Sequence, residues 1–397
     1  MDQFAVADNC LQIGGRSLTR LAEQVGSTPF YAYDRSVMAA QVAKLRTTLP
    51  PGIHLHYAMK ANPMPEVVKH LAGLTDGLDV ASAGELAVAL ATGTDPRDIS
   101  FAGPGKSHQD LEAAVASGVI INMESEGEMA RIAALATASG SRPRVAIRVN
   151  PDFELKTSGM KMSGGPKPFG VDAERVPAML ADLAALPLDF MGFHIFSGSQ
   201  NLRPEAIIEA QSKTFELAFR LAETAPRPVR WLNIGGGLGV PYFPGERRIE
   251  LEPIADNLAP LIDEAQRRLP GAEIVMELGR YLVAEAGIYV CEIVDKKISR
   301  GETFLITNGG LHHHLAASGN FGQVIRKNYP TCIGNRVSAN TIETVSVVGP
   351  LCTPLDILAD KMELPEAEVG DYVVVFQSGA YGYSASPRDF LSHPHPV

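Results

Sequence analysis

The chain has 397 residues, 45% hydrophobic and 20% charged, a balance typical of a soluble globular protein with room for two domains. Asp and Glu outnumber Lys and Arg by 45 to 35, and the net charge of −10 argues against a nucleic-acid or anionic-membrane partner. The four cysteines lack CxxC spacing, and the sequence shows neither an export signal nor an apolar run of about 18–20 residues, so we expect a cytoplasmic protein without a zinc cluster, a disulfide framework or a membrane span.

Between residues 53 and 277, short apolar segments alternate with helical patterns. The alternation predicts eight strands, at residues 53–59, 78–81, 99–102, 119–123, 145–149, 190–195, 231–234 and 274–277. Helical periodicity lies between most of them, at residues 84–92, 110–117, 124–139, 204–224 and 251–268. This order favours an α/β fold with a parallel sheet closed into a TIM-type (β/α)8 barrel, although strand number alone leaves an open doubly wound sheet as the alternative.

The pattern changes after Glu277, where strand-like segments have few long helices between them. These segments lie at residues 289–299, 304–307, 342–348 and 372–377. They predict a second, mostly antiparallel, β-barrel-like domain. Residues 11–13 are also strand-like, so we expect the barrel at 29–280 and the β domain at 1–28 and 281–397. The glycine-rich residues 158–168 are typical of a loop that lies over a site and gates it.

Lys60 directly follows the first predicted barrel strand, and Asn62-Pro63 prevents that strand from continuing. A lysine at the end of a buried strand can lose its hydration, which lowers its pKa and leaves a neutral amine able to form a Schiff base. An isolated lysine in such a turn is more often a surface residue. Lys60 nevertheless stands out, because the working residues of this barrel type lie at the C-terminal ends of the strands, and other strand ends also carry reactive groups.

Residues 235–237 form a glycine run at another strand end. Glycines there let backbone N–H groups converge on an anion. The spacing does not match a dinucleotide fingerprint, and a tight structural turn is the alternative. Because Gly279-Arg280 follows the next strand, we favour a site for a single phosphate.

Glu277 and His194 lie at two further strand ends. Glu277 either pairs with Arg280 or accepts a hydrogen bond from a protonated ring nitrogen, which would make that ring an electron sink. His194 is either a satisfied core histidine or, given its glycine and serine neighbours, a side chain that stacks on a planar ligand.

These motifs, in this order, resemble the fold-type III pyridoxal-phosphate decarboxylases, the group of diaminopimelate, ornithine and arginine decarboxylases. The resemblance covers nearly the whole chain and is carried by residues 57–62 (YAMKAN), 79–85 (DVASAGE), 194, 198–200 (GSQ), 235–237 (GGG) and 349–352 (GPLC). Residues 153–156, 311–313, 316–322 and 352–356 further resemble a diaminopimelate-decarboxylase-like branch associated with exosortase and exopolysaccharide systems.

The resemblance implies a pyridoxal 5'-phosphate cofactor and a homodimer with shared active sites. Lys60 would hold the cofactor covalently, His194 would stack on its ring, and Glu277 would keep the ring nitrogen protonated. The other implied cofactor contacts are Asp79 and Glu85 near Lys60, and Ser197, Gly235, Gly236, Gly237, Gly279, Arg280 and Tyr381 around the phosphate. Cys352 of the partner subunit would act as the acid near the α-carbon.

The implied reaction is decarboxylation of an amino acid through an external aldimine. The family usually places an acid after the catalytic cysteine to bind a distal amine, but here that position is Thr353. We therefore expect a substrate other than a simple basic amino acid. Arg326 and Tyr329 resemble the segment that binds a distal carboxylate, and Asp356 is a candidate replacement for the missing acid. A carboxylate or acyl tail fits this set, either on a small molecule or on a carrier protein.

Three alternatives are a diaminopimelate decarboxylase, an amino-acid racemase of the same barrel class and a non-catalytic, regulatory pyridoxal-phosphate-binding homologue. Glu277 argues against a racemase, which would use arginine at the ring nitrogen. The presence of Lys60 and Cys352 argues against an inactive homologue. We expect no metal site at residues 312–314, because adjacent histidines on an extended segment point to alternate sides.

Overall fold

The computed structural model describes residues 3–153, 160–161, 164–323, 326–338 and 340–397. It divides the chain into two compact units. One contains Met1–Ala40, Pro241–Glu246 and Leu282–Val397, and the other contains Gln41–Val240 and Arg247–Tyr281. The first boundary of this division lies after Ala40 instead of at the predicted 28/29, because the strand at Phe30–Tyr33 pairs with a strand far along the chain rather than with the barrel. The last boundary lies at 281/282, beside the predicted 280/281.

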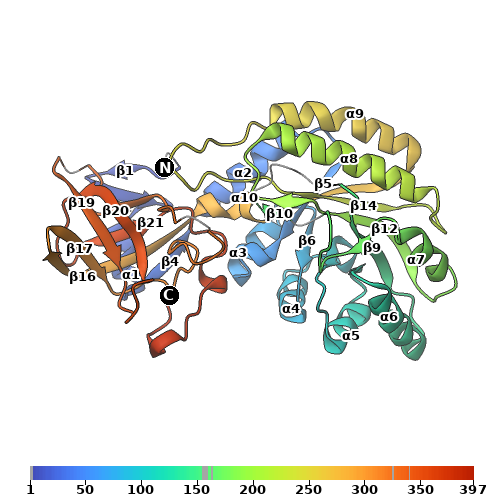
Figure 1. Ribbon diagram of the computed structural model, residues 1–397, viewed down its shortest axis with the longest axis horizontal. Helices are drawn as coiled ribbons and strands as arrows, with labels where there is room; N and C mark the ends of the chain where they lie inside the picture. Colours follow the sequence, from blue (N-terminus) through green and yellow to red (C-terminus); the bar gives the residue numbers. More distant parts are fainter. Residues whose placement is uncertain (1–2, 154–159, 162–163, 324–325, 339) are drawn as a thin grey trace. The chain divides into compact units, whose positions relative to one another are not determined.

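The larger unit contains a closed barrel of eight parallel strands, which confirms the predicted fold (Figure 1). Its strands are β5 (Ile53–Ala58), β6 (Gly77–Val80), β7 (Ile99–Phe101), β8 (Ile120–Met123), β9 (Arg144–Asn150), β12 (Asp189–Ile195), β14 (Trp231–Gly236) and β15 (Glu273–Leu278). The ring closes through the pairing of β8 with β9 and of β15 with β5. The short β11 (Val171–Asp172) adds to β9, and β10 (Met160–Lys161) pairs with β13 (Gly198–Ser199).

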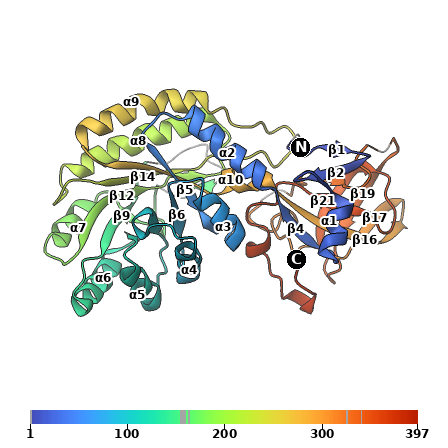
Figure 2. The ribbon, with the colours of Figure 1, turned by 180° about the vertical axis from the view of Figure 1, so that it is seen from behind.

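Helices surround the barrel strands, with α4, α5 and α6 on one side and α8 and α9 on the opposite side, as both views show (Figures 1 and 2). Their bounds are α2 (Arg35–Thr48), α3 (Pro65–Ala72), α4 (Ala83–Ala91), α5 (His108–Ser117), α6 (Glu126–Ser139), α7 (Val176–Leu183), α8 (Pro204–Ala222), α9 (Glu252–Arg268) and α10 (Arg280–Val283). Serines cap the N-termini of α4, α5 and α6, and Gly118 and Gly140 end α5 and α6 in the left-handed conformation.

Each barrel strand contributes at least one buried polar side chain, and we call a set of eight, one from each strand, the polar layer. Its members are His56, Asp79, Ser100, Asn122, Arg148, His194, Asn233 and Glu277. Several of them bond to their neighbours, for example Ser100 to Asp79 at 2.5 Å and Asn122 to Ser100 at 3.3 Å. Buried polar groups persist only where partners satisfy them, so this layer marks the part of the barrel that is built for chemistry rather than for packing alone.

The smaller unit is built on two sheets. One sheet joins β4 (Phe30–Tyr33), β16 (Gly287–Ser299), β17 (Glu302–Thr307), β18 (Thr331–Ile333), β19 (Ile342–Val348), β20 (Ile357–Pro365) and β21 (Tyr372–Val375). All its pairings are antiparallel except that of β17 with β19, which confirms the predicted mostly antiparallel domain. The other sheet contains β1 (Val6–Ala7), β2 (Cys10–Ile13) and β3 (Arg16–Ser17), and α1 (Leu18–Val25) follows it.

Among the described residues, no helix combines the length and the apolar character needed to cross a bilayer. The predicted loop at residues 158–168 lies partly outside the described residues, so its proposed gating role stays a prediction.

Candidate active site

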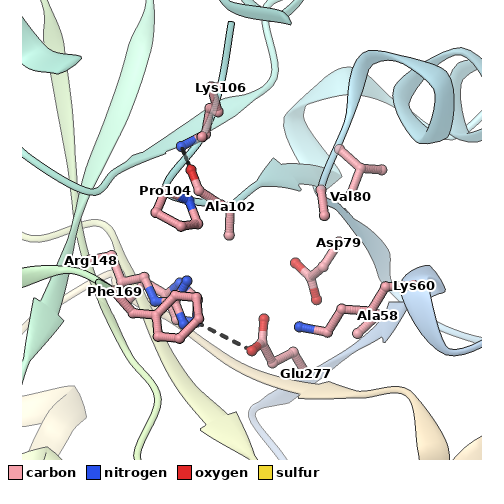
Figure 3. Close-up of a pocket in the computed structure, with 14 residues that line it drawn as sticks. Ala58, Lys60, Asp79, Val80, Ala102, Pro104, Lys106, Arg148, Phe169 and Glu277 are labelled. Atoms are coloured by element: carbon pink, nitrogen blue, oxygen red, sulfur yellow. Dashed lines mark hydrogen bonds and ion pairs between the residues drawn. The ribbon is translucent and has the colours of Figure 1, made fainter. Parts of the chain in front are cut away.

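A cavity of about 320 Å³ lies at the C-terminal ends of the barrel strands. It brings together four predicted site residues, Lys60, Asp79, His194 and Glu277, which come from different strand ends. The remaining wall is formed by Ala58, Val80, Ala81, Ala102, Gly103, Pro104, Gly105, Lys106, Arg148 and Phe169. Figure 3 shows the side chains of Lys60, Asp79 and Glu277 pointing toward one another, with Arg148 and Phe169 opposite them.

Lys60 lies in a 3-10 turn, Met59–Ala61, directly after β5. The hydroxyl of Tyr57 donates to the carbonyl of Asn62 at 2.8 Å and fixes this turn. The Lys60 amine lies 5.9 Å from the centre of the Phe196 ring. The side chain is exposed, so the burial expected of a lysine at a strand end is not found in this chain. The turn instead presents the amine to the cavity.

Glu277 is buried, and both its carboxylate oxygens have partners. Oε1 lies 3.3 Å from Nε2 of His194, and Oε2 accepts a hydrogen bond from Nδ2 of Asn233 at 3.2 Å. Burial opposes ionisation, but the neighbouring His194, Lys60 and Arg148 outweigh it and lower the pKa of Glu277 well below its ordinary value. Glu277 is therefore a fixed negative charge at the base of the cavity.

Asp79 is buried at the end of β6. Its Oδ1 accepts a hydrogen bond from Ser100 and lies 3.3 Å from Nδ1 of His56. Burial alone would lower the pKa of His56, but the adjacent carboxylate of Asp79 raises it overall.

Glu85 belongs to the first turn of α4 and does not line the cavity. Its carboxylate accepts from the backbone N–H of Ala81 at 2.7 Å and so holds the residue that precedes the N-cap, Ser82. Burial raises the pKa of Glu85, although the Ala81 N–H and the charge of Lys60 act in the opposite direction.

The glycine run ends β14, and backbone conformation explains its composition. Gly235 and Gly237 have φ of +68° and +78°, where a side chain is strained. A Cβ on Gly237 would also lie 2.5 Å from the carbonyl oxygen of Gly198. Gly236 and Ser197 line a second, smaller cavity of about 20 Å³ with Gly235. The run thus brings bare backbone against the loop that carries Ser197.

Gly279 and Arg280 lie at the end of the neighbouring strand. A Cβ on Gly279 would come within 2.8 Å of the carbonyl oxygen of Ala58, so glycine lets this turn approach the strand that precedes Lys60. Arg280 begins the short helix α10.

Three wall residues, Arg148, Lys106 and Phe169, were absent from the site predicted from the sequence. Arg148 donates to Glu124 at 2.7 Å and lies 5.0 Å from the Phe169 ring centre. The Glu124 carboxylate also accepts backbone N–H groups from two strand-end loops, at 2.7 and 2.8 Å, and so ties these loops to Arg148. Burial opposes the ionisation of Glu124, but Arg148 and Lys106 lower its pKa overall. The sequence feature that could have identified Arg148 and Lys106 is their position, because both lie at or shortly after the ends of predicted strands.

The other predicted site residues belong to the smaller unit. Cys352 is exposed and Thr353 half-buried, in the turn between β19 and β20. Arg326 donates to the carbonyls of Ser318 and Ile357 and to the Asn328 side chain. Tyr381 has a positive φ of +53°.

Two of these residues have marked structural roles. Tyr329 is buried, with its ring centre 4.8 Å from that of Tyr242. Asp356 is buried, and its two carboxylate oxygens accept the backbone N–H groups of Leu311 and Leu351. Its carboxylate therefore braces its own unit.

The residues 312–314 form a turn, not the predicted extended segment, because the N–H groups of His313 and His314 both bond to the carbonyl of Gly310. All three histidines are buried. Nε2 of His313 lies 2.9 Å from the Pro394 carbonyl, and Nε2 of His314 lies 2.9 Å from the Ser378 hydroxyl. His312 has no hydrogen-bond partner for either ring nitrogen among the described residues.

The burial of His312, His313 and His314 predicts that the free energy of unfolding decreases at acidic pH. Burial, with the neighbouring histidines, lowers the pKa of His312 to about 3, and burial lowers those of His313 and His314 to about 4 and about 3, from an ordinary 6.5. Below 6.5 the unfolded chain binds protons that the folded chain excludes, so stability present above pH 6.5 is lost as the pH falls toward about 4. Each histidine contributes a slope of about 1.4 kcal/mol per pH unit.

Urea unfolding between pH 6.5 and about 5 measures this slope. His312→Leu should reduce it by about 1.4 kcal/mol per pH unit, because it removes one such histidine. The matched control is His108→Leu, at an exposed histidine of α5, which should leave the slope unchanged. Equal slopes in wild type and His312→Leu would contradict the prediction.

The fold and the cavity together are those of a pyridoxal-dependent carboxy-lyase. Residues 35–284 match the family described as pyridoxal-dependent decarboxylase, pyridoxal binding domain, and the chain belongs to this family. Its cofactor is pyridoxal phosphate, and its activity is decarboxylation of an amino-acid group, rather than racemisation or a non-catalytic role.

Three similar proteins illustrate the relationship. The chain is 39% identical to the L-glutamyl-BtrI acyl-carrier protein decarboxylase of Niallia circulans, covering 93% of this chain and 88% of the relative. It is 32% identical to the 2-((L-alanin-3-ylcarbamoyl)methyl)-2-hydroxybutanedioate decarboxylase of Staphylococcus aureus, covering 92% of each. The crystal structure of diaminopimelate decarboxylase from Helicobacter pylori complexed with L-lysine has a TM-score of 0.84 at 28% identity, covering 95% of this chain and 92% of that one.

The residues present fit this cofactor. Two buried atoms of the cavity wall, Nδ1 of His194 and Oδ2 of Asp79, have no hydrogen-bond partner among the described residues. Buried polar atoms of this kind call for a polar ligand. The accessible amine of Lys60 suits an aldehyde, the carboxylate of Glu277 suits a protonated ring nitrogen, and the bare backbone of residues 235–237 suits a phosphate.

Proposed function

We propose that this enzyme decarboxylates an α-amino acid whose side chain ends in a neutral acyl linkage, such as a glutamyl group on a carrier protein. The observation that carries the proposal is Thr353, a neutral side chain where the family usually has an acid for a distal ammonium. Asp356 cannot replace that acid, because its two oxygens are taken by backbone N–H groups inside its own unit. An unpaired ammonium would be costly to bury there.

The printed names of two relatives support the same substrate class. One acts on an L-glutamyl group carried by an acyl-carrier protein, and the other on an alanine joined through its C3 to a carbamoyl group. In both names, the amino acid is joined to a larger group through an acyl linkage. Diaminopimelate decarboxylation is the second candidate, favoured by the structural similarity to the Helicobacter pylori enzyme.

Each barrel residue of the cavity then has its own proposed role in the reaction. Pyridoxal phosphate, when bound, supplies an aldehyde for an amine and a ring that accepts the electron pair released as CO2 leaves. Lys60 would provide the amine that anchors the cofactor, and His194 would contact its ring. Glu277 holds a proton on the ring nitrogen. Asp79 and Glu85 act near Lys60, while Ser197, residues 235–237, Gly279 and Arg280 hold the phosphate.

A comparison of substrates tests the proposal. Purified enzyme is offered glutamate joined through its side-chain carboxyl to a phosphopantetheinyl carrier or to pantetheine, and separately diaminopimelate, ornithine and arginine. We expect kcat/KM for a glutamyl thioester to exceed that for diaminopimelate by about 100-fold or more, because a site lacking a partner for a charge discriminates strongly against it. Efficient turnover of diaminopimelate with none of either thioester would overturn the proposal.

Substitutions at position 353 sharpen this comparison. Thr353→Glu should raise kcat/KM for diaminopimelate relative to wild type, because it supplies a carboxylate for the distal ammonium. Thr353→Gln is the control, since it has the same size without the charge. Equal effects of the two substitutions would show that volume, not charge, sets the preference.

We further propose a homodimer in which Cys352 of the partner subunit completes each active site and returns a proton to the α-carbon. Cys352 is exposed on its own subunit, as a residue that serves a partner must be. Mixing is the test: Lys60→Ala and Cys352→Ala should each be nearly inactive alone. Refolded together, they should regain about a quarter of wild-type activity, because half of the dimers are mixed and each mixed dimer has one intact site.

The matched control is a mixture of Lys60→Ala with Glu277→Gln, which lie in the same barrel. Such mixed dimers have no intact site and should stay inactive. Absence of recovery in the Lys60→Ala and Cys352→Ala mixture, with mixed dimers shown to form, would contradict the shared site.

A further inference from the structure

Asn233 is a fully buried side chain of β14 and belongs to the polar layer. Its Nδ2 donates to Oε2 of Glu277 at 3.2 Å, and its Oδ1 accepts from the backbone N–H of Gly235 at 2.8 Å. One amide thus touches both the carboxylate at the base of the cavity and the first residue of the glycine run.

The orientation of this amide follows from its partners. A backbone N–H can only donate, so the atom that faces Gly235 must be the amide oxygen. The NH2 group is then left to face Glu277, and it can bond only to an acceptor. Asn233 therefore favours the ionised form of Glu277, in the same direction as His194, Lys60 and Arg148.

Asn233 also lies where the backbone leaves regular pairing. Between Asn233 and Gly236 the register of β14 against β15 shifts, and Gly235 has a φ of +68°. In such a bulge a backbone N–H loses its strand partner. The Asn233 side chain supplies an acceptor for the N–H of Gly235 and so holds the start of the glycine run.

We propose that Asn233 is a positioning residue that joins the carboxylate for the cofactor ring nitrogen to the backbone that receives the cofactor phosphate. It contacts neither ligand group itself and acts through Glu277 and Gly235. The proposal rests on the roles assigned above to Glu277 and to residues 235–237. It predicts that both ends of the cofactor lose affinity when this one amide is removed.

The test measures binding of pyridoxal phosphate to the apoenzyme by equilibrium dialysis, with the absorbance spectrum of the bound cofactor. Asn233→Ala should weaken binding by about 10-fold or more, since it removes a hydrogen bond to a charged group and one to the glycine run. The matched control is Asn335→Ala, at a half-buried asparagine of the smaller unit whose amide likewise donates to a carboxylate, that of Asp371, and accepts from a backbone N–H, that of Tyr372. It should cost similar thermal stability while keeping near wild-type cofactor affinity.

A second variant keeps the test decisive if Asn233→Ala does not fold. Asn233→Asp retains an acceptor for Gly235 but replaces the donor to Glu277 by a second carboxylate. We expect a folded protein whose cofactor affinity falls about 10-fold and whose spectrum differs from wild type. Wild-type affinity and spectrum in the Asn233 variants would overturn the proposal. Because these measurements use no substrate, that outcome is distinct from a failure of the proposed acyl-linked substrate.

Discussion

Lys60→Ala is expected to abolish covalent attachment of pyridoxal phosphate and to lower turnover by about 10³-fold or more. The physical reason is that the cofactor aldehyde can reach the amine of Lys60 but not that of Lys106. Two lysines line the cavity, and burial lowers the pKa of Lys106. The Lys106 amine, however, donates to the carbonyls of Gly103 and Asn122 and to Glu128, all at 2.7–2.8 Å, and is thereby immobilised. Lys60 is exposed to the cavity, so it is the amine that can meet an aldehyde.

Borohydride reduction of the enzyme loaded with cofactor, followed by peptide mapping, measures this attachment directly. The modified peptide should contain Lys60 in wild type and should vanish in Lys60→Ala. The control Lys69→Ala changes an exposed lysine of α3 outside the cavity wall and should leave labelling intact. Label on Lys106 in wild type would contradict the assignment.

The barrel could be predicted from the sequence because its strands are apolar runs that end on Gly, Pro or polar residues. Each of the eight predicted segments overlaps an observed strand. In the smaller unit, β1, β3, β4, β18 and β20 were not predicted. The partner of β4 is β16, more than 250 residues away, so local periodicity carries little information about it.

The site was predictable only in part, for a related reason. Lys60, Asp79, His194 and Glu277 are recognisable because each ends a strand within a motif. The bond from Arg148 to Glu124 joins residues 24 positions apart, and it depends on how neighbouring strands align. The same holds for Asn233, whose bond to Glu277 spans 44 positions. Side-chain networks between strands follow from register, which no single segment encodes.

A contact between distant residues also explains why residues 312–314 differ from the predicted extended segment. The three histidines lie in a turn whose N–H groups converge on the Gly310 carbonyl, and Asp356 fixes the adjacent backbone by accepting from Leu311. A local pattern of three identical residues cannot reveal that a carboxylate 45 positions later holds the segment in this conformation.

Glu277→Gln should keep the cofactor bound while lowering turnover by about 10²- to 10³-fold. The substitution preserves shape and burial, but it replaces a charged acceptor by a neutral amide. The wild-type carboxylate stays ionised because His194, Lys60 and Arg148 lower its pKa against the opposing effect of burial. Only an ionised group can stabilise the positive charge on a protonated ring nitrogen, and that charge is what draws the electron pair from the departing carboxylate.

The measurement is the rate of CO2 release from the best substrate of the wild type, with cofactor content determined on the same samples. Glu273→Gln is the matched control, since Glu273 lies on the same strand at its exposed first position. It should keep near wild-type turnover. The sign of the pKa shift adds a second expectation: because the pKa of Glu277 lies below its ordinary value, wild-type turnover should not fall through protonation of Glu277 at mildly acidic pH. Full cofactor content with an unchanged turnover number in Glu277→Gln would show that the ring nitrogen does not depend on this carboxylate, and the electron sink would have to be sustained by another group.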